Sequence, residues 1–92
     1  MGDLEFNWIN EKNILLKRER NICFEDVVTA IENNKLLDSI KNQSENHQEQ
    51  YCLIIDISNY AYIVPFVQER NLFFLKTMYK SRKQTKKYFK GV

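Results

Sequence analysis

The sequence predicts an α+β fold in which an N-terminal pair of helices packs on a 3–4-stranded antiparallel sheet and a basic C-terminal helix follows. Three observations predict it. Apolar residues recur at helical spacing before residue 35, β-branched and aromatic residues dominate residues 51–79, and the last seventeen residues are basic without one acid. Helices and strands in separate stretches are typical of this class. Residues 1–92 fit a single domain.

The first predicted elements are a short strand or anchoring arm and a helix. Alternating aromatic residues indicate the strand or arm over residues 5–8. A helix is expected over residues 10–20, with Asn10 as its N-cap and Asn21 as a left-handed C-cap. The side of this helix that faces the core is expected to carry Ile14, Leu15 and Arg18.

A second helix is expected to begin at Phe24. The next two residues are acids, which favour the positive end of the helix dipole. Asn33 and Asn34 are expected to end the helix. Its apolar residues repeat at i, i+3, i+4 and i+7 and form one stripe, made of Phe24, Val27, Val28 and Ile31.

Residues 36–41 predict a strand, and two strongly β-prone runs predict a hairpin over residues 51–67. Between them, residues 42–50 contain no apolar residue and predict an exposed loop, in which His47 is expected to be solvated. The two-residue turn Ser58-Asn59 sets the hairpin register. One face is then expected to pair Ile57 with Tyr60, Ile55 with Tyr62, Leu53 with Val64 and Tyr51 with Phe66.

The other face of this hairpin is also largely apolar, so a partner, the C-terminal segment or a bound ligand is expected to cover it. Pro65 cannot donate to a strand ladder and predicts an edge or a bulge. A third long strand is expected over residues 72–79. A final helix is expected after Ser81 as its cap, to about Lys90.

Charge is divided sharply along the chain. Residues 76–92 hold seven Lys and Arg and no acid, whereas the first 75 residues hold the other seven bases and all twelve acids. The net charge of +2 therefore combines a body of −5 with a C-terminal segment of +7. Such a segment is suited to a large anion, which in a cell is a nucleic acid or a membrane.

The final helix concentrates this charge. Arg82 and Lys86, like Lys83 and Lys87, stand at i, i+4, where each like-charge pair costs about 0.2–0.5 kcal/mol. A bound polyanion would offset that cost. Ser81 and the free N–H groups of the first turn predict an anion site, and an arginine can grip a phosphate through two parallel hydrogen bonds.

Aromatic residues are interleaved with this charge. Tyr79 is expected to stack on a base. Tyr88 and Phe89 are better interpreted as the stripe that attaches the helix to the sheet, which disfavours membrane binding. Lys76 shares its expected strand face with apolar neighbours. Two alternatives remain for its side chain: it extends along the apolar surface, or its ammonium reaches the cluster of Arg82 and its neighbours.

Several classes of site are not indicated. The sequence has no Cys-His or Ser-His arrangement, no Gly-rich phosphate loop and no carboxylate cluster. Asp56 is expected to close the hairpin rather than to catalyse. Cys23 and Cys52 are isolated and expected to be reduced. Together with a single His they are too few for a metal site of about four ligands, so neither a metal nor a cofactor is expected. Without a long apolar run or a secretory signal, a cytoplasmic protein is expected.

Short motifs resemble one known family. Phe6-x-Trp8, then Lys12-Asn13, then Ile22-x-Phe24-Glu25-Asp26 resemble the F-x-W…K…(I/V)-S-F-E-(E/D) pattern of BrnT-like toxins from bacterial type II toxin–antitoxin modules. The segment 80–85 resembles their closing I-S-A-R-(R/K)-A-T motif. Cys23 stands where that family has a capping Ser, which is expected to weaken the cap of the second helix. Gln68-Glu69-Arg70 only loosely matches the family's T-E-R.

The resemblance implies a RelE-like fold and an endoribonuclease that blocks translation by cutting RNA without metal or cofactor. It also implies an antitoxin partner with a ribbon-helix-helix DNA-binding domain. Ser81 and Thr85 match the small residue and the threonine that flank the family's basic pair. That pair corresponds to Arg82 and Lys83, which are the expected catalytic residues with Lys76 assisting, while the expected RNA-binding residues are Tyr79, Lys80, Ser81, Lys86 and Lys87.

Two other functions stay open from sequence. The chain can be a non-catalytic domain of the same fold that binds nucleic acid or an antitoxin. It can also be an interaction protein whose apolar outer sheet face receives a partner helix. Without an acid–base pair, any RNA cleavage must orient a 2′-hydroxyl and stabilise the charged phosphorane with Lys and Arg.

Overall fold

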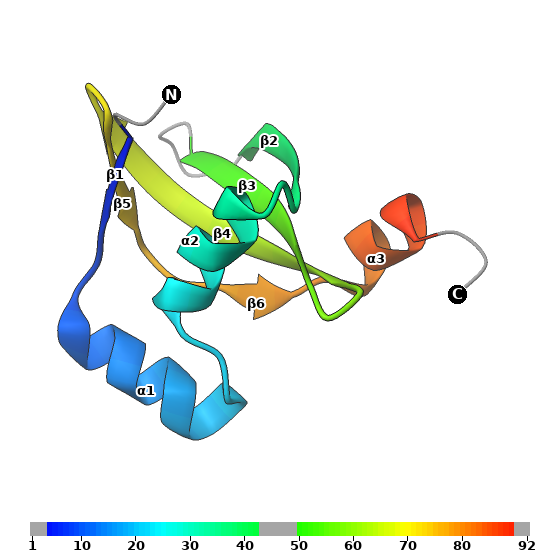
Figure 1. Cartoon of the computed structure of the whole chain (residues 1–92), viewed down its shortest axis with the longest axis horizontal. Coiled ribbons are helices and arrows are strands. Elements are labelled where there is room, and N and C mark those ends of the chain that lie inside the picture. The colour runs from blue at the N-terminus through cyan, green and yellow to red at the C-terminus, as the bar shows by residue number, and fades with distance from the viewer. Residues whose placement is uncertain (1–3, 43–49, 90–92) are drawn as a thin grey trace.

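A computed structural model describes residues 4–42 and 50–89 and confirms the α+β class (Figure 1). The predicted solvated His47 lies outside the described residues, and the last helix, expected to reach about Lys90, ends at Tyr88. In chain order the elements are β1 (Glu5–Asn7), α1 (Asn10–Arg20), α2 (Phe24–Glu32), β2 (Leu36–Asn42), β3 (Gln50–Ile57), β4 (Tyr60–Glu69), β5 (Leu72–Leu75), β6 (Tyr79–Lys80) and α3 (Arg82–Tyr88).

The sheet is larger than predicted and is mixed. Its strand order is β1-β5-β4-β3-β2, and β6 also pairs with β4. β1 runs parallel to β5, with Phe6 opposite Phe73, while the other pairs are antiparallel. The prediction of three or four antiparallel strands was therefore wrong. The parallel pair joins opposite ends of the chain, and no local turn signals such a pairing.

The hairpin of β3 and β4 has the predicted register, with all four expected pairs in place. Ser58 and Asn59 both have positive φ, 56° and 65°, as a two-residue type I′ turn requires. Asp56 Oδ1 accepts a 2.9 Å hydrogen bond from the N–H of Asn59. Asp56 therefore supports the turn, as its position in the sequence predicted.

The third long strand is broken, contrary to prediction. β5 ends at Leu75 and β6 begins at Tyr79, so three residues stand opposite two residues of β4, Val64 and Pro65. This extra residue is a β-bulge, as Pro65 predicted. The N–H of Lys76, in the bulge, donates a 2.9 Å hydrogen bond to the carbonyl of Pro65. Because the bulge shifts the alternation by one residue, side chains after it change face.

Of the two N-terminal helices, α2 packs on one face of the sheet, and α1 joins the same core through Leu16. Figure 1 shows α2 in front of β3 and β4, with α1 below it. The core between them joins residues of both helices, of the intervening loop and of the sheet: Leu16, Ile22, Phe24, Val27, Ala30, Leu53, Ile55, Tyr62, Val64, Phe66, Leu75 and Met78. The capping prediction was correct at Asn21, which is left-handed with φ 58°, but Ile9 rather than Asn10 precedes α1 as its N-cap.

The buried side of α1 differs from the prediction because a polar residue occupies it. Asn13 is 8% exposed, while Ile14 is 55% exposed. Asn13 Oδ1 accepts a 2.6 Å hydrogen bond from the N–H of Phe24, and its Nδ2 donates to Glu25 Oε1 at 2.8 Å. Asn13 thus provides a hydrogen-bond acceptor for a backbone N–H in the first turn of α2. The carboxylate of Asp26 also accepts from the Cys23 N–H at 3.0 Å, so the start of α2 is capped despite the missing Ser.

The opposite face of the sheet is partly covered by α3. Ile54 and Ala61 are fully buried, yet they lie outside the core formed with α1 and α2. Thr85 Oγ1 accepts a 2.9 Å hydrogen bond from the N–H of Ala61. The hydroxyl of Tyr88 donates to Asp38 Oδ2 at 2.9 Å, on β2. The C-terminal segment therefore covers this part of the second apolar face.

Candidate nucleic-acid interface

Beyond the pairing of β6 with β4, Ala61 of β4 attaches the start of α3. The N–H of Ser81 donates to the carbonyl of Ala61 at 2.9 Å, and the N–H of Ala61 donates to Thr85 Oγ1. Thr85 Oγ1 in turn donates to the Ser81 carbonyl at 2.7 Å. Ser81 Oγ accepts from the N–H of Gln84 at 3.1 Å and confirms the predicted N-cap. Ser81 and Thr85 therefore fix where α3 starts and how it points.

This attachment leaves one side of α3 basic. Gln84, Thr85 and Tyr88 are half-buried toward the sheet. The exposed side carries the four predicted cations, Arg82, Lys83, Lys86 and Lys87. We call these four residues the α3 basic face. Both predicted like-charge pairs lie along this side of the helix, where one extended anion can contact all four cations.

Acids do not neutralise the α3 basic face within residues 4–42 and 50–89. The ion pair found there joins Lys35 to Asp56 at 3.8 Å, on another part of the molecule. Lys87 lies with its ammonium 5.4 Å from the ring centre of Tyr88, and a weak attraction links it to Asp38. These contacts leave the positive charge exposed.

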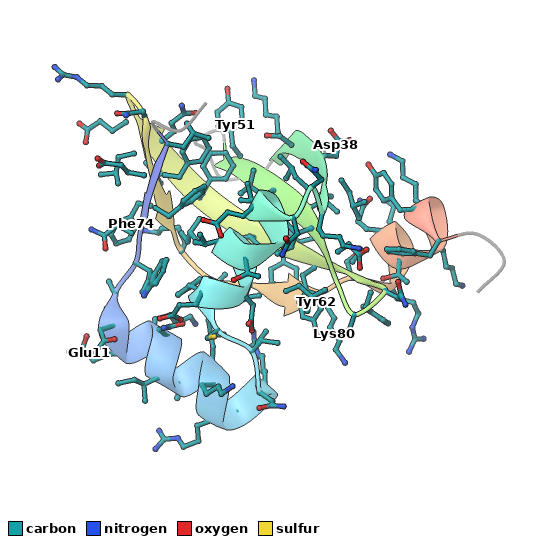
Figure 2. All side chains as sticks on the ribbon, in the orientation of Figure 1. Glu11, Asp38, Tyr51, Tyr62, Phe74 and Lys80 are labelled. Carbon is teal, nitrogen blue, oxygen red and sulfur yellow. The ribbon has the colours of Figure 1, made fainter. Side chains whose placement is uncertain are left out.

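Beside β6, a groove of about 360 Å³ connects the helical layer to this basic segment. It is lined by the end of α1, the loop after it, β4 and β6: Arg20, Ile22, Tyr62, Tyr79 and Lys80. Arg20 Nη1 donates a 2.8 Å hydrogen bond to the carbonyl of Met78, which ties α1 to the strand segment. Figure 2 shows the labelled Tyr62 and Lys80 close together beside β6. Two of the expected RNA-binding residues thus share a groove with Arg20.

The groove joins an apolar floor to polar walls. Ile22 and Tyr62 are each 6% exposed, while Arg20 and Lys80 are exposed. The ammonium of Lys80 lies 5.2 Å from the ring centre of Tyr60, and the rings of Tyr60 and Tyr62 meet edge to face at 6.2 Å. This cation–π contact holds the lysine beside the aromatic pair.

The phenols at the groove stay neutral at physiological pH. Burial raises the pKa of Tyr62, with smaller contributions from the nearby phenol of Tyr60 and carboxylate of Asp26. Burial also raises the pKa of Tyr79, with a smaller contribution from Cys52. Both hydroxyls therefore remain hydrogen-bond donors, and neither becomes a base near neutral pH.

Lys76 lies in a different hollow from Tyr79 and Lys80. That hollow, of about 220 Å³, is formed with Ile9, Lys12, Phe74 and Leu75. The ammonium of Lys76 is 5.7 Å from the ring centre of Phe74. Of the two alternatives left by the sequence, the side chain extends along an apolar surface. Lys76 thus lies beside Phe74, an apolar neighbour on its expected strand face.

Three groove residues were not predicted from sequence. Arg20 is the last residue of α1, where a base favours the negative end of the helix dipole, and this gives it an ordinary structural role. Ile22 and Tyr62 are of residue types that usually fill a core, so their positions in the sequence do not indicate a binding site. The alternation of Tyr60 and Tyr62 does place both rings on one face, but only the folded arrangement brings α1 to them.

The described residues show neither a metal cluster nor a membrane helix. No three His, Cys, Asp or Glu side chains gather there. None of the helices among them is both long and apolar enough to cross a bilayer. No protein-family model matches the chain, and no curated protein matches its sequence.

Proposed function

We propose that this chain binds single-stranded RNA through the α3 basic face and acts as an endoribonuclease toxin of a bacterial type II toxin–antitoxin module. The observation that carries the proposal is the α3 basic face itself, which stands exposed and forms no ion pair with an acid in the described part of the chain. The ordered motifs that resemble BrnT-like toxins favour the toxin over other RNA-binding proteins.

Arg82 and Lys83 bind the scissile phosphate in this proposal. The ribose 2′-hydroxyl loses its proton to solvent as its oxygen attacks the adjacent phosphorus, the 5′-oxygen of the next nucleotide leaves and takes a proton from solvent, and a 2′,3′-cyclic phosphate remains. Cations held at the phosphorane lower the barrier because negative charge grows there in the transition state. Lys80, Lys86 and Lys87 follow the backbone and align the strand for in-line attack. Residues of this chain supply all the charge required, without metal or cofactor.

The proposed partner is a cognate antitoxin with a ribbon-helix-helix DNA-binding domain, and the proposed compartment is the cytoplasm. An antitoxin that covers the α3 basic face with acids would block RNA directly. Charge complementarity of this kind also accelerates association.

A non-catalytic RNA-binding domain is the second candidate. The position of Lys76 favours it, because Lys76 lines a hollow to which neither Arg82 nor Lys83 contributes. The same basic face then holds RNA without cutting it. Both candidates predict RNA binding, and only the toxin predicts RNA cleavage.

Induced expression tests the toxin proposal in cells. Wild-type protein is expected to arrest growth, and Arg82→Ala with Lys83→Ala is expected to relieve the arrest. Lys17→Ala with Arg18→Ala is the matched control, since it removes two exposed charges from α1 and should leave the arrest intact. Arrest by the α3 double variant at equal protein level would contradict the site.

A further inference from the structure

The groove beside β6 combines an apolar surface with cations, whereas the α3 basic face consists of cations alone. Its floor is Ile22 and Tyr62, both almost fully buried, and its walls carry the cations of Arg20 and Lys80. On α3 the cations project from a helix surface, where they can contact phosphates only. In the groove an apolar surface and two cations face the same space.

The size and charge of this space define what fits it. A volume of about 360 Å³ lies at the small end of the range for small-molecule sites, roughly 300–1,000 Å³. A planar apolar ring can lie against the floor, and an anionic group attached to it can lie between Arg20 and Lys80. A nucleotide carries both parts on one scaffold.

The groove is also built rather than incidental. Arg20 is held by its hydrogen bond to the Met78 carbonyl, and Lys80 by the ring of Tyr60. Side chains that are already fixed lose less entropy when a ligand binds. Lys80 is followed after one residue by Arg82, so the groove lies next in the chain to the start of the α3 basic face.

We propose that the groove of Arg20, Ile22, Tyr62, Tyr79 and Lys80 is a subsite that takes one nucleotide of single-stranded RNA, with its base on the floor and its phosphate between Arg20 and Lys80. This inference rests on the proposed RNA-binding function and adds to it a contact that requires a base to be present. Hydrophobic and stacking contacts do not depend on base identity, so the subsite accepts any base.

Fluorescence anisotropy with two labelled strands of equal length tests the subsite. One is a ten-nucleotide single-stranded RNA made non-cleavable by 2′-O-methylation, and the other has the same methylated backbone without bases. One well-contacted base contributes about 1–3 kcal/mol, so wild-type protein is expected to bind the base-bearing strand at least about fivefold more tightly. Arg20→Gln with Lys80→Gln is expected to bring the two affinities together, because without the phosphate contact the base is no longer held on the floor of the groove.

The matched control is Lys86→Gln with Lys87→Gln, which removes the same charge from the α3 basic face. It is expected to weaken both strands by a similar factor and to keep the preference for bases. Lys80→Gln alone changes an exposed position and so tests the groove even if the Arg20 variant misfolds. It is expected to reduce the preference for the base-bearing strand.

The outcomes separate the subsite from the proposed function. Equal affinity of wild-type protein for the two strands, or a preference that survives in the groove variants, overturns the subsite and leaves RNA binding in place. Failure of wild-type protein to bind either strand overturns RNA binding and the subsite with it.

Discussion

The hydroxyl of Tyr88 donates a 2.9 Å hydrogen bond to Asp38 Oδ2 and so joins α3 to the edge strand β2. This bond lowers the pKa of Asp38, with help from the backbone N–H of Ser39. Burial raises the pKa of Tyr88, and the bond to Asp38 raises it further. Together with the contact between Thr85 and Ala61, it directs the α3 basic face away from the sheet.

The docking of α3 is expected to depend on pH. The lowered pKa of Asp38 stabilises the fold above its unfolded value of about 3.9, and this contribution is lost as the pH falls through the folded pKa. The raised pKa of Tyr88 contributes below about pH 10 and is lost as the pH rises through the folded pKa. Exchange protection of the α3 amides should therefore hold from about pH 4 to 10 and fall outside that window. Tyr88→Phe is the control and should lose this dependence, whereas identical profiles for the two proteins would contradict the role of the bond.

Asn13 is expected to stabilise the junction of α1 and α2. Asn13→Ala leaves the buried N–H of Phe24 without a partner and should lower the free energy of unfolding by about 1–3 kcal/mol. Urea unfolding measures the change. Ile14→Ala, next to it but exposed, should change stability by less than about 0.5 kcal/mol. Equal losses in the two variants would show that the hydrogen bonds of Asn13 are not the cause.

Thr85 is expected to hold α3 through its hydroxyl rather than its methyl group. Thr85→Val keeps the size but leaves the N–H of buried Ala61 unpaired, which should cost about 1–3 kcal/mol in urea unfolding. Thr85→Ser keeps the hydroxyl and should retain most of the stability. If Val and Ser variants are equally stable, the hydrogen bond from Ala61 does not fix the helix.

RNA binding is expected to depend steeply on salt through the α3 basic face. Each phosphate contact with single-stranded RNA contributes about −0.7 to the slope of log K against log salt concentration. Arg82→Gln with Lys83→Gln should therefore make the slope about 1.4 less steep, as measured by anisotropy with a non-cleavable RNA. Lys17→Gln with Arg18→Gln should leave it nearly unchanged. A slope that is the same in wild-type and α3 variants would place the RNA elsewhere.

The parts of the fold with local signals were predictable from sequence. Ser58 and Asn59 fix the hairpin register because a two-residue turn permits few geometries. Asn21 ends α1 because Asn tolerates left-handed backbone. Ser81 begins α3 because its hydroxyl replaces a missing helix hydrogen bond.

The parts that failed depend on contacts distant in sequence. The third long strand was expected to be continuous over residues 72–79, because its extra residue becomes a bulge only through pairing with β4. Asn13 was not expected inside because its partners, Phe24 and Glu25, belong to the next helix. Arg20 joined the site only because the fold places the end of α1 beside β6. The charge of the site was therefore predictable, and its groove was not.

Cleavage of a defined RNA tests the central claim most directly. Purified protein is incubated with a labelled single-stranded RNA in EDTA, and the products are mapped for cut sites and for 2′,3′-cyclic phosphate ends. The account predicts cuts with cyclic phosphate ends by wild-type protein, and their loss in Arg82→Ala with Lys83→Ala while Lys17→Ala with Arg18→Ala still cuts. Intact RNA with wild-type protein, or equal cutting by the α3 double variant, would contradict it.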